Sequence, residues 1–557
     1  MTQTHSREEA IKQDIKDLHK LGYAQELFRS MGGFSNFAIS FSIISILTGA
    51  VLLYDYGLAW AGTAAVLIGW PLVTVFVLLI AASMSEIASA YPTAGGLYYW
   101  ASRMKNKNWG WWTAWLNLIG QFAIVAGINY AAALFLNGTI VTPLLDKIGV
   151  AYANTTVLLS VGATPLITGA LLTMLILVLF ELLLNIVGIN LVAMLNQVSV
   201  WWHIAIVAAV VVLVFLAGKP DQSGLTLFAI QPVDTVGTWE NNLQVVKFSY
   251  GPANTYPLIL AFFFSLLQAN WTYTGYDASA HVAEETVGAR VASAWGVFLS
   301  VAVSAVVGFI FLFALTTHLP SLSTLFPAEL TDTATYSQYY FGDGAAVLSI
   351  LNYNLGFVGD LLGAGIAIAM AFCGLSSVAS AGRMLYAFSR DDGLPGSGWL
   401  KKVSHRYRTP ANALAAIVIV AWVFNVAAAY FGGGGSAIVI VTAISTIFLY
   451  AAYGVTIYLG ATTQGWLSER VWSLGRWSKP VAWLALLWVV VLIFLFSWPT
   501  SGNIAWPFMV AVVLFLVVYY FGWARKRFAG PKVQGMEAQL TEIEREFEQA
   551  AEQLSEA

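Results

Sequence analysis

One short stretch, "WTYTGYDASAH" at residues 271–281, concentrates the residue types that could do chemistry in this chain. It follows "LILAFFFSLLQAN" (258–270), whose apolar part is long enough for only about half of a membrane crossing. Gly275 costs a helix interior about 1 kcal/mol, and Asp277 is expensive in hydrocarbon, which makes it a functional candidate by default. We therefore predict a helix that is interrupted between Asn270 and Asp277 and restarts directly afterwards.

A second apolar stretch has the same character. "FSNFAISFSIISIL" (34–47) leads into Thr48 and Gly49, and "AVLLYDYG" (50–57) then resumes. A broken helix is tolerated at membrane depth only where it lines protein or a cavity, and two interrupted helices at matching places point to the binding site of a transporter. The alternative is that the two glycines only permit close packing of helices.

Backbone groups at such breaks lose their helical partners and can bind a ligand. A half-helix N-terminus suits a carboxylate, so the amides of Ala50 and Val51 after Gly49 are candidates for a carboxylate site. The carbonyls from Asn270 to Tyr273 are candidates for an ammonium site. The predicted substrate-binding residues are Thr48, Gly49, Ala50, Val51, Trp271, Tyr273, Thr274, Gly275 and Tyr276.

Three aromatic side chains and the aspartate each allow two interpretations. Trp271, Tyr273 and Tyr276 could hold an ammonium group by cation–π attraction, or they could be packing or interfacial residues. Asp277 could be the N-cap of the half-helix that begins at residue 278, or a proton-sensitive gate, and the two roles are compatible. We expect Asp277→Asn to fold and to change the pH dependence of transport.

The composition places these stretches in a membrane. Hydrophobic residues make up 59% of the 557 residues and charged residues only 10%, against about 25% charged in soluble domains. The single cysteine, Cys373, excludes an intramolecular disulfide. Residues 1–33 are polar and charged, so no signal peptide is expected there.

Twelve apolar segments are long enough to span the membrane. They are 34–60, 63–84, 97–136, 165–188, 191–217, 256–283, 291–318, 356–389, 411–430, 436–459, 481–498 and 504–523. The interrupted spans are five apart and so run in opposite directions, which predicts an inverted repeat of spans 1–5 (34–217) and 6–10 (256–459). Spans 11 and 12 (481–523) are appended, and the third span is so long that we expect it to be tilted.

Positive charge predicts the orientation. All but three of the 26 Lys and Arg residues fall in tails and loops on one side of this topology, and only Lys147, Lys219 and Lys247 fall on the other. The positive-inside rule then places both tails (1–33 and 524–557) in the cytoplasm. The long loops 137–164, 218–255 and 319–355 lie outside.

Three motifs resemble the amino acid–polyamine–organocation permease family. They are "YPTAGGLYYW" (91–100), "GYDASAHVAEET" (275–286) and "AGRMLYAFSRDDGLP" (381–395). "GFSNFAISFSIISILTG" (33–49) and "SVWWHI" (199–204) are similar to the branch that carries amino acids, 4-aminobutyrate and choline. The resemblance covers roughly residues 20–525 and implies an all-α, LeuT-type fold with broken spans 1 and 6. One departure is Leu47-Thr48-Gly49, where the family's first glycine is missing.

The resemblance also implies roles for single residues. Trp271 matches the aromatic residue that closes over the substrate, and Asp277 matches an acid that takes part in the pH response. His203 matches a position where some proton-coupled members have a lysine, and a histidine titrates near neutrality. The alternative is a neutral histidine bonded between helices. Ser376 and Ser377 match the neighbourhood of a cation site, where they could complete a sodium site or bond His203.

The expected function is that of a secondary transporter. No phosphate-binding Gly-Lys-Ser/Thr loop is present, and the six histidines are scattered, so neither ATP drive nor a metal or catalytic constellation is predicted. The expected substrate is an amino acid such as 4-aminobutyrate, with choline or a polyamine as the alternative. Protons are preferred to sodium as the coupling ion, and uptake, exchange and efflux stay open. We expect no cofactor, no metal and no nucleic acid, and we place the protein in the plasma (inner) membrane.

The C-terminal tail is acidic and amphipathic. Residues 535–557 hold seven glutamates and one arginine, and their apolar residues recur in heptad-like steps. These residues are Met536, Leu540, Ile543, Phe547, Ala550 and Leu554. Docking on the cytoplasmic face is the first interpretation and self-association the second.

Overall fold

The computed structural model describes most of the chain. The described residues are 2–162, 164–219, 227–228, 230, 258–319, 345–404, 406–432, 436–497, 505–532, 535 and 537–556. Most of the predicted loops 218–255 and 319–355 fall outside this set, as does Met536 of the tail stripe.

Within the described residues, 11 helices are long and apolar enough to cross a membrane. They correspond to the predicted spans except for the sixth. There the chain forms three short helices, α13 (Leu258–Ser265), α14 (Leu267–Thr272) and α15 (Ala278–His281), so no single helix reaches the length of a span. The chain is an all-α polytopic membrane protein, as predicted, with one small β-hairpin added.

The first half of the bundle contains the following elements in chain order. They are α1 (Thr2–Lys20), α2 (Gly33–Ile44), α3 (Ile46–Leu52), α4 (Tyr54–Ala61), α5 (Ala64–Leu67), α6 (Gly69–Ala90), α7 (Leu97–Met104), α8 (Lys107–Leu136), α9 (Thr142–Asp146), β1 (Val157–Val161), β2 (Thr164–Thr168), α10 (Gly169–Val187) and α11 (Ile189–Ala217).

The second half begins with the three short helices of the sixth span. They are followed by α16 (Ala289–Thr317), α19 (Ala345–Leu355), α20 (Phe357–Arg390), α21 (Ser397–Leu400), α22 (Ala411–Gly432), α23 (Ser436–Thr462), α24 (Ser478–Ser497), α25 (Ala505–Tyr519), α26 (Arg525–Arg527) and α27 (Glu537–Glu556).

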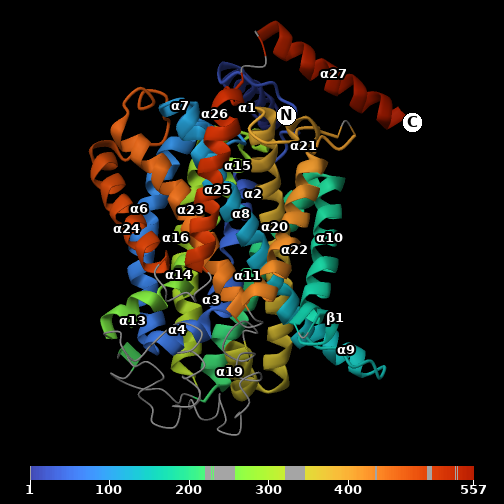
Figure 1. The fold of residues 1–557 in the computed structure, drawn as a ribbon, viewed down its shortest axis with the longest axis vertical. Coiled ribbons are helices and arrows are strands. Elements are labelled where there is room, and N and C mark those ends of the chain that lie inside the picture. Colours follow the sequence, from blue (N-terminus) through green and yellow to red (C-terminus); the bar gives the residue numbers. More distant parts are fainter. Residues whose placement is uncertain are drawn as a thin grey trace.

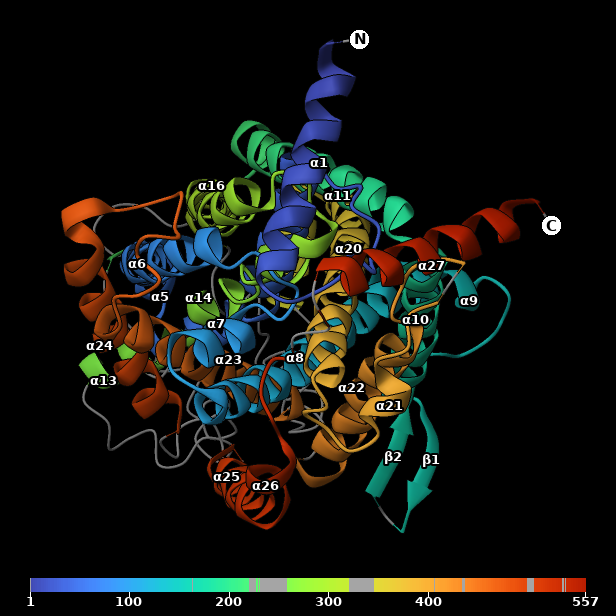
Figure 2. The same ribbon diagram turned by 90° about the horizontal axis from the view of Figure 1, so that it is seen from above.

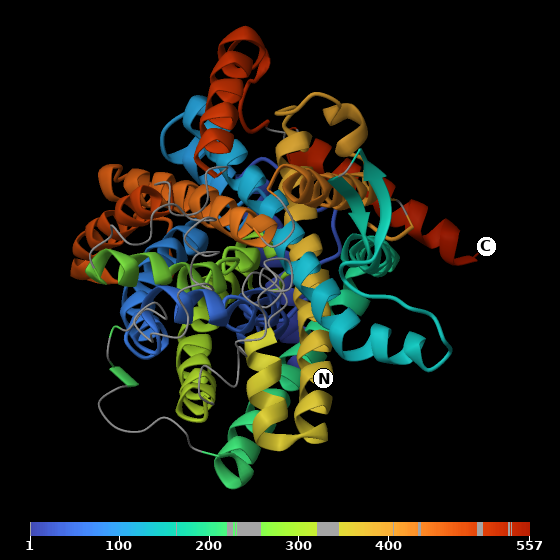
Figure 3. The same cartoon turned by 60° about the horizontal axis from the view of Figure 1, so that its bottom comes forward.

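Both chain termini lie at the same end of the bundle, which we call the tail end (Figure 1). Helix α1 lies across this end, and α27 extends outward from it (Figure 2). Helices α4, α13 and α19 lie at the opposite end (Figure 3). Two termini at one end agree with an even number of membrane crossings.

Burial separates central from peripheral helices. Within an 18-residue stretch of each span, 94% of the residues are buried in Gly33–Leu52 and 89% in Ile438–Thr462, whereas only 17% are buried in Trp506–Arg527. Apolar side chains on the outer helices, such as Leu514 and Val518, are exposed, as expected for a surface that faces lipid. The first interrupted span therefore lies in the centre of the bundle.

Two local predictions were wrong. The predicted third span, 97–136, is not one helix, because the chain leaves the helix at Lys105 and α8 starts anew with Asn106 as its N-cap. The Asn106 side chain accepts hydrogen bonds from the backbone N–H groups of Asn108 and Trp109. The predicted loop 137–164 also contains β1, which pairs antiparallel with β2, so the fourth span begins only at Gly169.

Candidate functional site

The interruption of the first span lies at Ser45, between α2 and α3. Ser45 has φ 25° and ψ 89°, a left-handed conformation that L-residues rarely adopt. The predicted break over residues 47–49 was wrong, because Thr48 and Gly49 lie inside α3 and their N–H groups donate to the Ser45 carbonyl at 2.8 and 3.0 Å. The break needs no glycine at 47–49 because Ser45 itself carries the unusual backbone angles.

This shift moves the candidate carboxylate site. Ala50 and Val51 belong to the second turn of α3 and not to its free N-terminal end. The N–H groups of Ile46 and Leu47 are the ones that have no backbone acceptor among the described residues, as expected for a first helical turn. Gly49 instead allows close packing, since a methyl group there would lie 2.7 Å from the Thr272 Cα atom.

The interruption of the sixth span runs from Tyr273 to Asp277, between α14 and α15. Gly275 has φ 92°, and a methyl group at this position would overlap the Ile43 side chain. The prediction of a break at Gly275 is confirmed, although helix α14 continues two residues beyond Asn270 before it ends. A side chain at position 275 is excluded by two features, the backbone angle and the close approach of α2.

The carbonyls near this break are unequally occupied. The Asn270 carbonyl accepts from the Tyr450 hydroxyl at 3.2 Å, and the Trp271 carbonyl accepts from the Thr274 hydroxyl at 2.6 Å. In the described part of the chain, no hydrogen bond reaches the carbonyls of Thr272 and Tyr273. Of the predicted run Asn270–Tyr273, these two remain as candidate partners for a cation.

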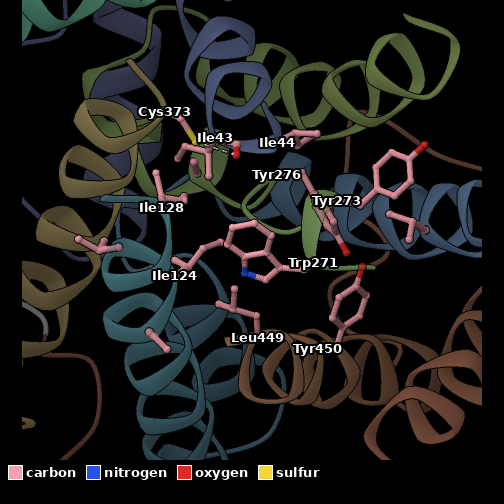
Figure 4. Close-up of a cluster of buried hydrophobic side chains, with 14 of the residues drawn as sticks. Ile43, Ile44, Ile124, Ile128, Trp271, Tyr273, Tyr276, Cys373, Leu449 and Tyr450 are labelled. Carbon is pink, nitrogen blue, oxygen red and sulfur yellow. Dashed lines mark hydrogen bonds between the residues drawn. The ribbon is translucent and has the colours of Figure 1, made fainter. Parts of the chain in front are cut away.

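The two interruptions meet at a small cavity of about 10 Å³. Its lining residues are Ile43, Ile44, Thr48, Gly49, Ile124, Ile128, Trp271, Thr272 and Thr274. Figure 4 shows the Trp271 indole beside Ile124, with Tyr273 and Tyr276 farther along the same segment. The indole N–H donates to the Ser445 hydroxyl on α23 at 2.9 Å. Four of the predicted binding residues, Thr48, Gly49, Trp271 and Thr274, therefore share one space.

The other predicted binding residues lie outside this lining. The Tyr273 ring packs 4.6 Å from the Trp70 ring, and its hydroxyl shares a 2.6 Å hydrogen bond with Thr74. The Tyr276 ring packs 5.0 Å from Tyr453, and its buried hydroxyl has no partner among the described groups. Packing is thus the observed role of Tyr273, as in the alternative interpretation.

Two residues of α8, Ile124 and Ile128, line the cavity but were not predicted. Their spacing of four places them on one helical face with Asn117 and Gln121, so the polar residues of this helix were an available signal. Asn117 and Gln121 bridge helices, because both donate to the carboxylate of Asp277 in the sixth span.

Asp277 is fully buried and does not cap α15, since its side chain makes no capping hydrogen bond. The capping interpretation was therefore wrong. The carboxylate instead accepts four hydrogen bonds from side chains. The donors are Tyr453 Oη (2.8 Å), Asn117 Nδ2 (3.1 Å), Gln121 Nε2 (3.2 Å) and His281 Nε2 (3.1 Å). Four donors suit the ionised carboxylate.

His281 was missed in the sequence, although it stands four residues after Asp277, where helical neighbours interact. Its Nδ1 atom lies 3.1 Å from the Ala94 carbonyl, and its Nε2 atom faces Asp277. With a carbonyl and a carboxylate as neighbours, the ring can donate to both at once only in its doubly protonated form, which would make an ion pair with Asp277. His281 thus joins the sixth span to the segment before α7.

His203 on α11 reaches the interruption of the first span. Its Nδ1 atom lies 2.8 Å from the Ser199 carbonyl, which can only accept, so Nδ1 carries the hydrogen. In the neutral ring Nε2 is then an acceptor for the Ser45 hydroxyl at 2.8 Å, and Ser45 Oγ accepts from Thr48 at 2.7 Å. His203 and the strained residue Ser45 thus form one hydrogen-bonded chain with Thr48.

Ser376 and Ser377 do not join this chain. The Ser376 hydroxyl donates to Asn196 Oδ1 at 2.7 Å, and the Ser377 hydroxyl donates to the Gly374 carbonyl at 2.8 Å. The expectation that they bond His203 was wrong, because their hydroxyls bond other groups. No cluster of three or more His, Cys, Asp or Glu side chains that could hold a metal occurs among the described residues.

At the tail end, ion pairs hold the end of the sixth span against α20. Glu285 accepts two hydrogen bonds from Arg383, at 3.0 and 3.2 Å, and Glu284 accepts two from Arg390, at 3.0 and 2.9 Å. The two acids and the two arginines come from the second and third family-like motifs. Bidentate pairs of this kind fix geometry as well as charge.

The N-terminal segment covers the same end. Asp14 of α1 accepts from the N–H groups of Gly288 and Ala289 at the start of α16, at 2.7 and 3.1 Å. Burial raises the pKa of the Asp14 carboxyl, and the nearby Arg29 guanidinium offsets only part of this effect. Arg29 also donates to the carbonyls of Ala283 and Thr286, so the tail segment is tied to the end of the sixth span.

The C-terminal helix α27 docks on this N-terminal segment. Glu544 accepts from the backbone N–H of Gln25 and pairs with His19, both at 2.8 Å, and Leu540 is buried. Upstream of α27, the Lys532 N–H donates to Asp391 at 2.9 Å. These contacts agree with the first interpretation of the tail, docking against the predicted cytoplasmic face.

Comparison with known proteins covers nearly the whole bundle. Residues 31–519 match the family described as "Amino acid permease". The chain is similar to "Amino-acid permease BAT1" of Arabidopsis thaliana, with 32% identity over 92% of this chain and 95% of that protein. It is 31% identical to "Amino-acid permease BAT1 homolog" of Oryza sativa subsp. japonica, over 87% of each chain. "Thiamine transporter thi9" of Schizosaccharomyces pombe is 27% identical over 91% of this chain and 85% of its own. The family match includes both interruptions.

Proposed function

The chain belongs to the amino acid permease family of secondary transporters, and we propose that it moves a small amino acid, with 4-aminobutyrate as the first candidate, by alternating access. The observation that carries this proposal is the meeting of two interrupted helices at one central cavity. Thr272, whose carbonyl lacks a helical partner, lines this cavity. The free N–H groups of Ile46 and Leu47 lie along the chain between the lining residues Ile44 and Thr48, and such groups beside a cavity are expected of a transporter's binding site.

The two kinds of free backbone group match the two ends of an amino acid. The N–H groups of Ile46 and Leu47 at the start of α3 suit a carboxylate, because a helix N-terminus carries partial positive charge. The carbonyls of Thr272 and Tyr273 at the end of α14 suit an ammonium group. Trp271 adds an aromatic surface to the same cavity.

The cavity is closed in this conformation. A volume of about 10 Å³ is at the limit for one water molecule, which needs about 10–15 Å³, so an amino acid does not fit. Binding therefore requires α2 and α3 to move relative to α14 and α15. Because the ion pairs of Glu284 and Glu285 lock the tail end, we propose that they open when the site faces that side.

A proton is the preferred coupling ion because of the chain from His203 to Thr48. When a proton binds His203 Nε2, this atom becomes a donor, and the Ser45 hydroxyl must turn to accept from it. Ser45 then donates to Thr48, which lines the cavity. Protonation of His203 would in this way change the hydrogen bonding at the substrate site. This change does not require a sodium ion.

Choline and polyamines are less well supported than amino acids. These substrates carry no carboxylate, and a polyamine would require an acidic group in the cavity. The one acid of the "WTYTGYDASAH" stretch, Asp277, is outside the cavity lining and is occupied by four donors. It therefore offers no free negative charge to a cationic substrate.

Transport assays test the proposal directly. Purified protein in liposomes is offered radiolabelled 4-aminobutyrate, protein amino acids, choline and putrescine, with either an inward proton gradient or an inward sodium gradient. We expect an amino acid to accumulate at least tenfold over protein-free liposomes with the proton gradient alone. Accumulation of choline or putrescine only, or a strict need for sodium, would contradict the proposal.

The same liposomes test His203. His203→Ala should exchange external for internal amino acid at a rate similar to the unmodified protein, but should no longer accumulate it with a proton gradient. Full proton-driven accumulation by this variant would exclude His203 from coupling.

A labelling experiment tests the proposed cytoplasmic position of both tails in the plasma membrane. Single cysteines are introduced in the N-terminal and C-terminal tails, and intact cells are labelled from each side of the membrane.

A further inference from the structure

A buried carboxyl group outside the central cavity has no hydrogen-bond donor. Glu181 on α10 is only 2% exposed, and neither of its carboxyl oxygens has a partner among the described residues. An ionised carboxylate without a donor is costly in a protein interior, and more so at membrane depth. Asp277 differs from Glu181 in this respect, because four donors surround its carboxylate and suit the ionised form.

The group that faces Glu181 is also an acceptor. Asn129 on α8 is fully buried, and its Nδ2 atom donates to the Val125 carbonyl at 3.0 Å, which directs Oδ1 away from that carbonyl. Asn129 Oδ1 has no partner in the described structure. A methyl group placed at Gly374 on α20 would overlap both Glu181 Oε1 and Asn129 Oδ1, so the two oxygens share one small space beside Gly374.

We propose that Glu181 is a proton-binding site, in which the neutral carboxyl group donates a hydrogen bond to Asn129 Oδ1, and that this proton is exchanged during transport. A proton needs only one acceptor facing the carboxyl group, whereas a calcium-like cation needs six or more oxygen ligands. Here the Asn129 oxygen faces the Glu181 carboxyl group, so the single acceptor that a proton needs is present. The inference rests on the proposed proton coupling, and it makes Glu181 a second proton-binding residue besides His203.

The position of Glu181 connects it to the moving part of the bundle. Gly374 follows Cys373, whose thiol donates to the Ile43 carbonyl at 3.2 Å in the last turn of α2 (Figure 4). Ile43 lines the substrate cavity and lies two residues before the interruption at Ser45. When α2 moves relative to α20, the space shared by Glu181 and Asn129 beside Gly374 changes with it. The surroundings of a proton held there therefore change during the conformational cycle.

The surroundings contain few other groups that titrate. Asn185 on α10 ties the Glu181 carbonyl to α20 through its Nδ2 atom. Cys373 on α20 is the one titratable side chain in electrostatic contact with Glu181 among the described residues. Helix α8 offers only Lys107 and Tyr130, α22 only Tyr430, and α11 only His203, whose ring bonds Ser45 and Ser199. Helix α20 also carries Asp360, Arg383, Tyr386 and Arg390, but its two arginines pair with Glu285 and Glu284. Among the described residues, no basic side chain of these helices forms an ion pair with Glu181.

Infrared spectroscopy tests the protonation itself and needs no substrate. The protein in lipid nanodiscs at neutral pH should show the C=O stretch of a protonated carboxylic acid, and Glu181→Gln should lose it. Glu86→Gln is the matched control, because Glu86 is similarly buried but accepts from Arg470 at 2.7 Å and from two further donors. The band should survive in that control. A spectrum without a band that depends on Glu181 overturns the proposal.

Transport separates the proton site from a structural role. The probe is a mixture of radiolabelled protein amino acids and 4-aminobutyrate in liposomes. Glu181→Gln keeps a donor for Asn129, so it should fold and exchange label across the membrane at a rate within about twofold of the unmodified protein. Its accumulation with an inward proton gradient should fall at least tenfold. Accumulation equal to that of the unmodified protein overturns the role of Glu181 in coupling.

The two proposals fail in different ways. If the unmodified protein transports none of the probes, the proposed function is contradicted, and the infrared band alone then decides whether Glu181 holds a proton. If the unmodified protein transports amino acids without any response to the proton gradient, transport stands and the coupling role of Glu181 is overturned.

Discussion

Spans 1 and 6 are both interrupted in the centre of the bundle, but the two interruptions rest on different residues. In span 6 the break contains Gly275 at φ 92°, and the adjacent Asp277 is held by four donors. In span 1 the break is Ser45 at φ 25°, a residue with a side chain in a conformation that favours glycine. Its hydroxyl bonds Thr48 and His203.

The difference separates a rigid break from one that can respond. Gly275 satisfies the backbone geometry without strain, and the buried contact between Asp277 and His281 fixes the segment after it. Ser45 stores backbone strain, which is common at sites that move, and under the proposed coupling its hydrogen bonds would change direction when His203 binds a proton. We expect substitutions in span 6 to cost mainly stability and those in span 1 to affect mainly coupling.

Gly275→Ala should have the largest effect. The added methyl group would overlap Ile43 and would force a left-handed conformation on alanine. Overpacking costs about 1–3 kcal/mol and the backbone angle about 1–2 kcal/mol, so the free energy of unfolding should fall by about 2–5 kcal/mol. Thermal unfolding of the purified protein in detergent measures the change.

Gly288→Ala is the matched control for this substitution. Gly288 also has a positive φ, 66°, but a methyl group there would meet no atom within 4 Å. Only the conformational cost of about 1–2 kcal/mol should remain. Equal losses in the two variants would show that the contact with Ile43 does not hold span 6 in place.

Asp277→Asn should have the next largest effect. The amide accepts fewer hydrogen bonds than the carboxylate and leaves His281 without its charged partner. Hydrogen bonds to charged groups contribute about 1.5–3 kcal/mol, and a loss of this size leaves the protein folded. We also expect the pH dependence of uptake to change. Tyr453→Phe removes one donor from the same carboxylate at 2.8 Å and should reduce stability less, so an unchanged pH profile in both variants would limit Asp277 to a structural role.

Ser45→Gly and Ser45→Ala separate strain from hydrogen bonding in span 1. Both variants lose the bonds to His203 and Thr48, but only glycine relieves the backbone. The glycine variant should therefore be more stable than the alanine variant by about 1 kcal/mol, and both should lose proton-driven accumulation. Chemical unfolding in detergent compares the two, and an alanine variant of equal or greater stability would argue against strain at Ser45.

Ser377→Ala should have the smallest effect. Its hydroxyl bonds only the Gly374 carbonyl of its own helix, and such a bond contributes about 0.5–1.5 kcal/mol. Since the Ser377 hydroxyl bonds neither interruption, the pH dependence of uptake should stay that of the unmodified protein. A shifted pH profile would return this serine to the coupling pathway and weaken the contrast between the two breaks.

The spans and the break at Gly275 could be predicted because their signals are local. A bilayer forces the backbone to satisfy its hydrogen bonds within the helix, so apolar length predicts a span, and glycine in a short apolar run predicts an interruption. The break at Ser45 escaped prediction because no local residue marks it. It depends on Thr48 within the same turn and on His203 in another helix.

The hydrogen-bond partners of the buried polar side chains also could not be predicted from local sequence signals. Asp277 looked like an N-cap from its neighbours, but its donors on α8 and α23 lie more than a hundred residues away along the chain. Glu181 and Asn129 are polar residues within apolar stretches of the sequence. Nothing in the sequence indicated that their acceptor oxygens face each other beside Gly374. His281 was the exception, since its spacing from Asp277 was readable.

From its sequence alone, this chain can be recognised as a helical membrane protein, with the positions of most helices and the interruption of span 6 at Gly275. These features follow from backbone hydrogen bonding and apolar length, which act over neighbouring residues. The place where span 1 breaks, the donors that hold Asp277 and the carboxyl group that lacks a donor became visible only in the folded chain. Such choices depend on which side chains meet across helices, because a buried polar group is stabilised only by the partner that reaches it.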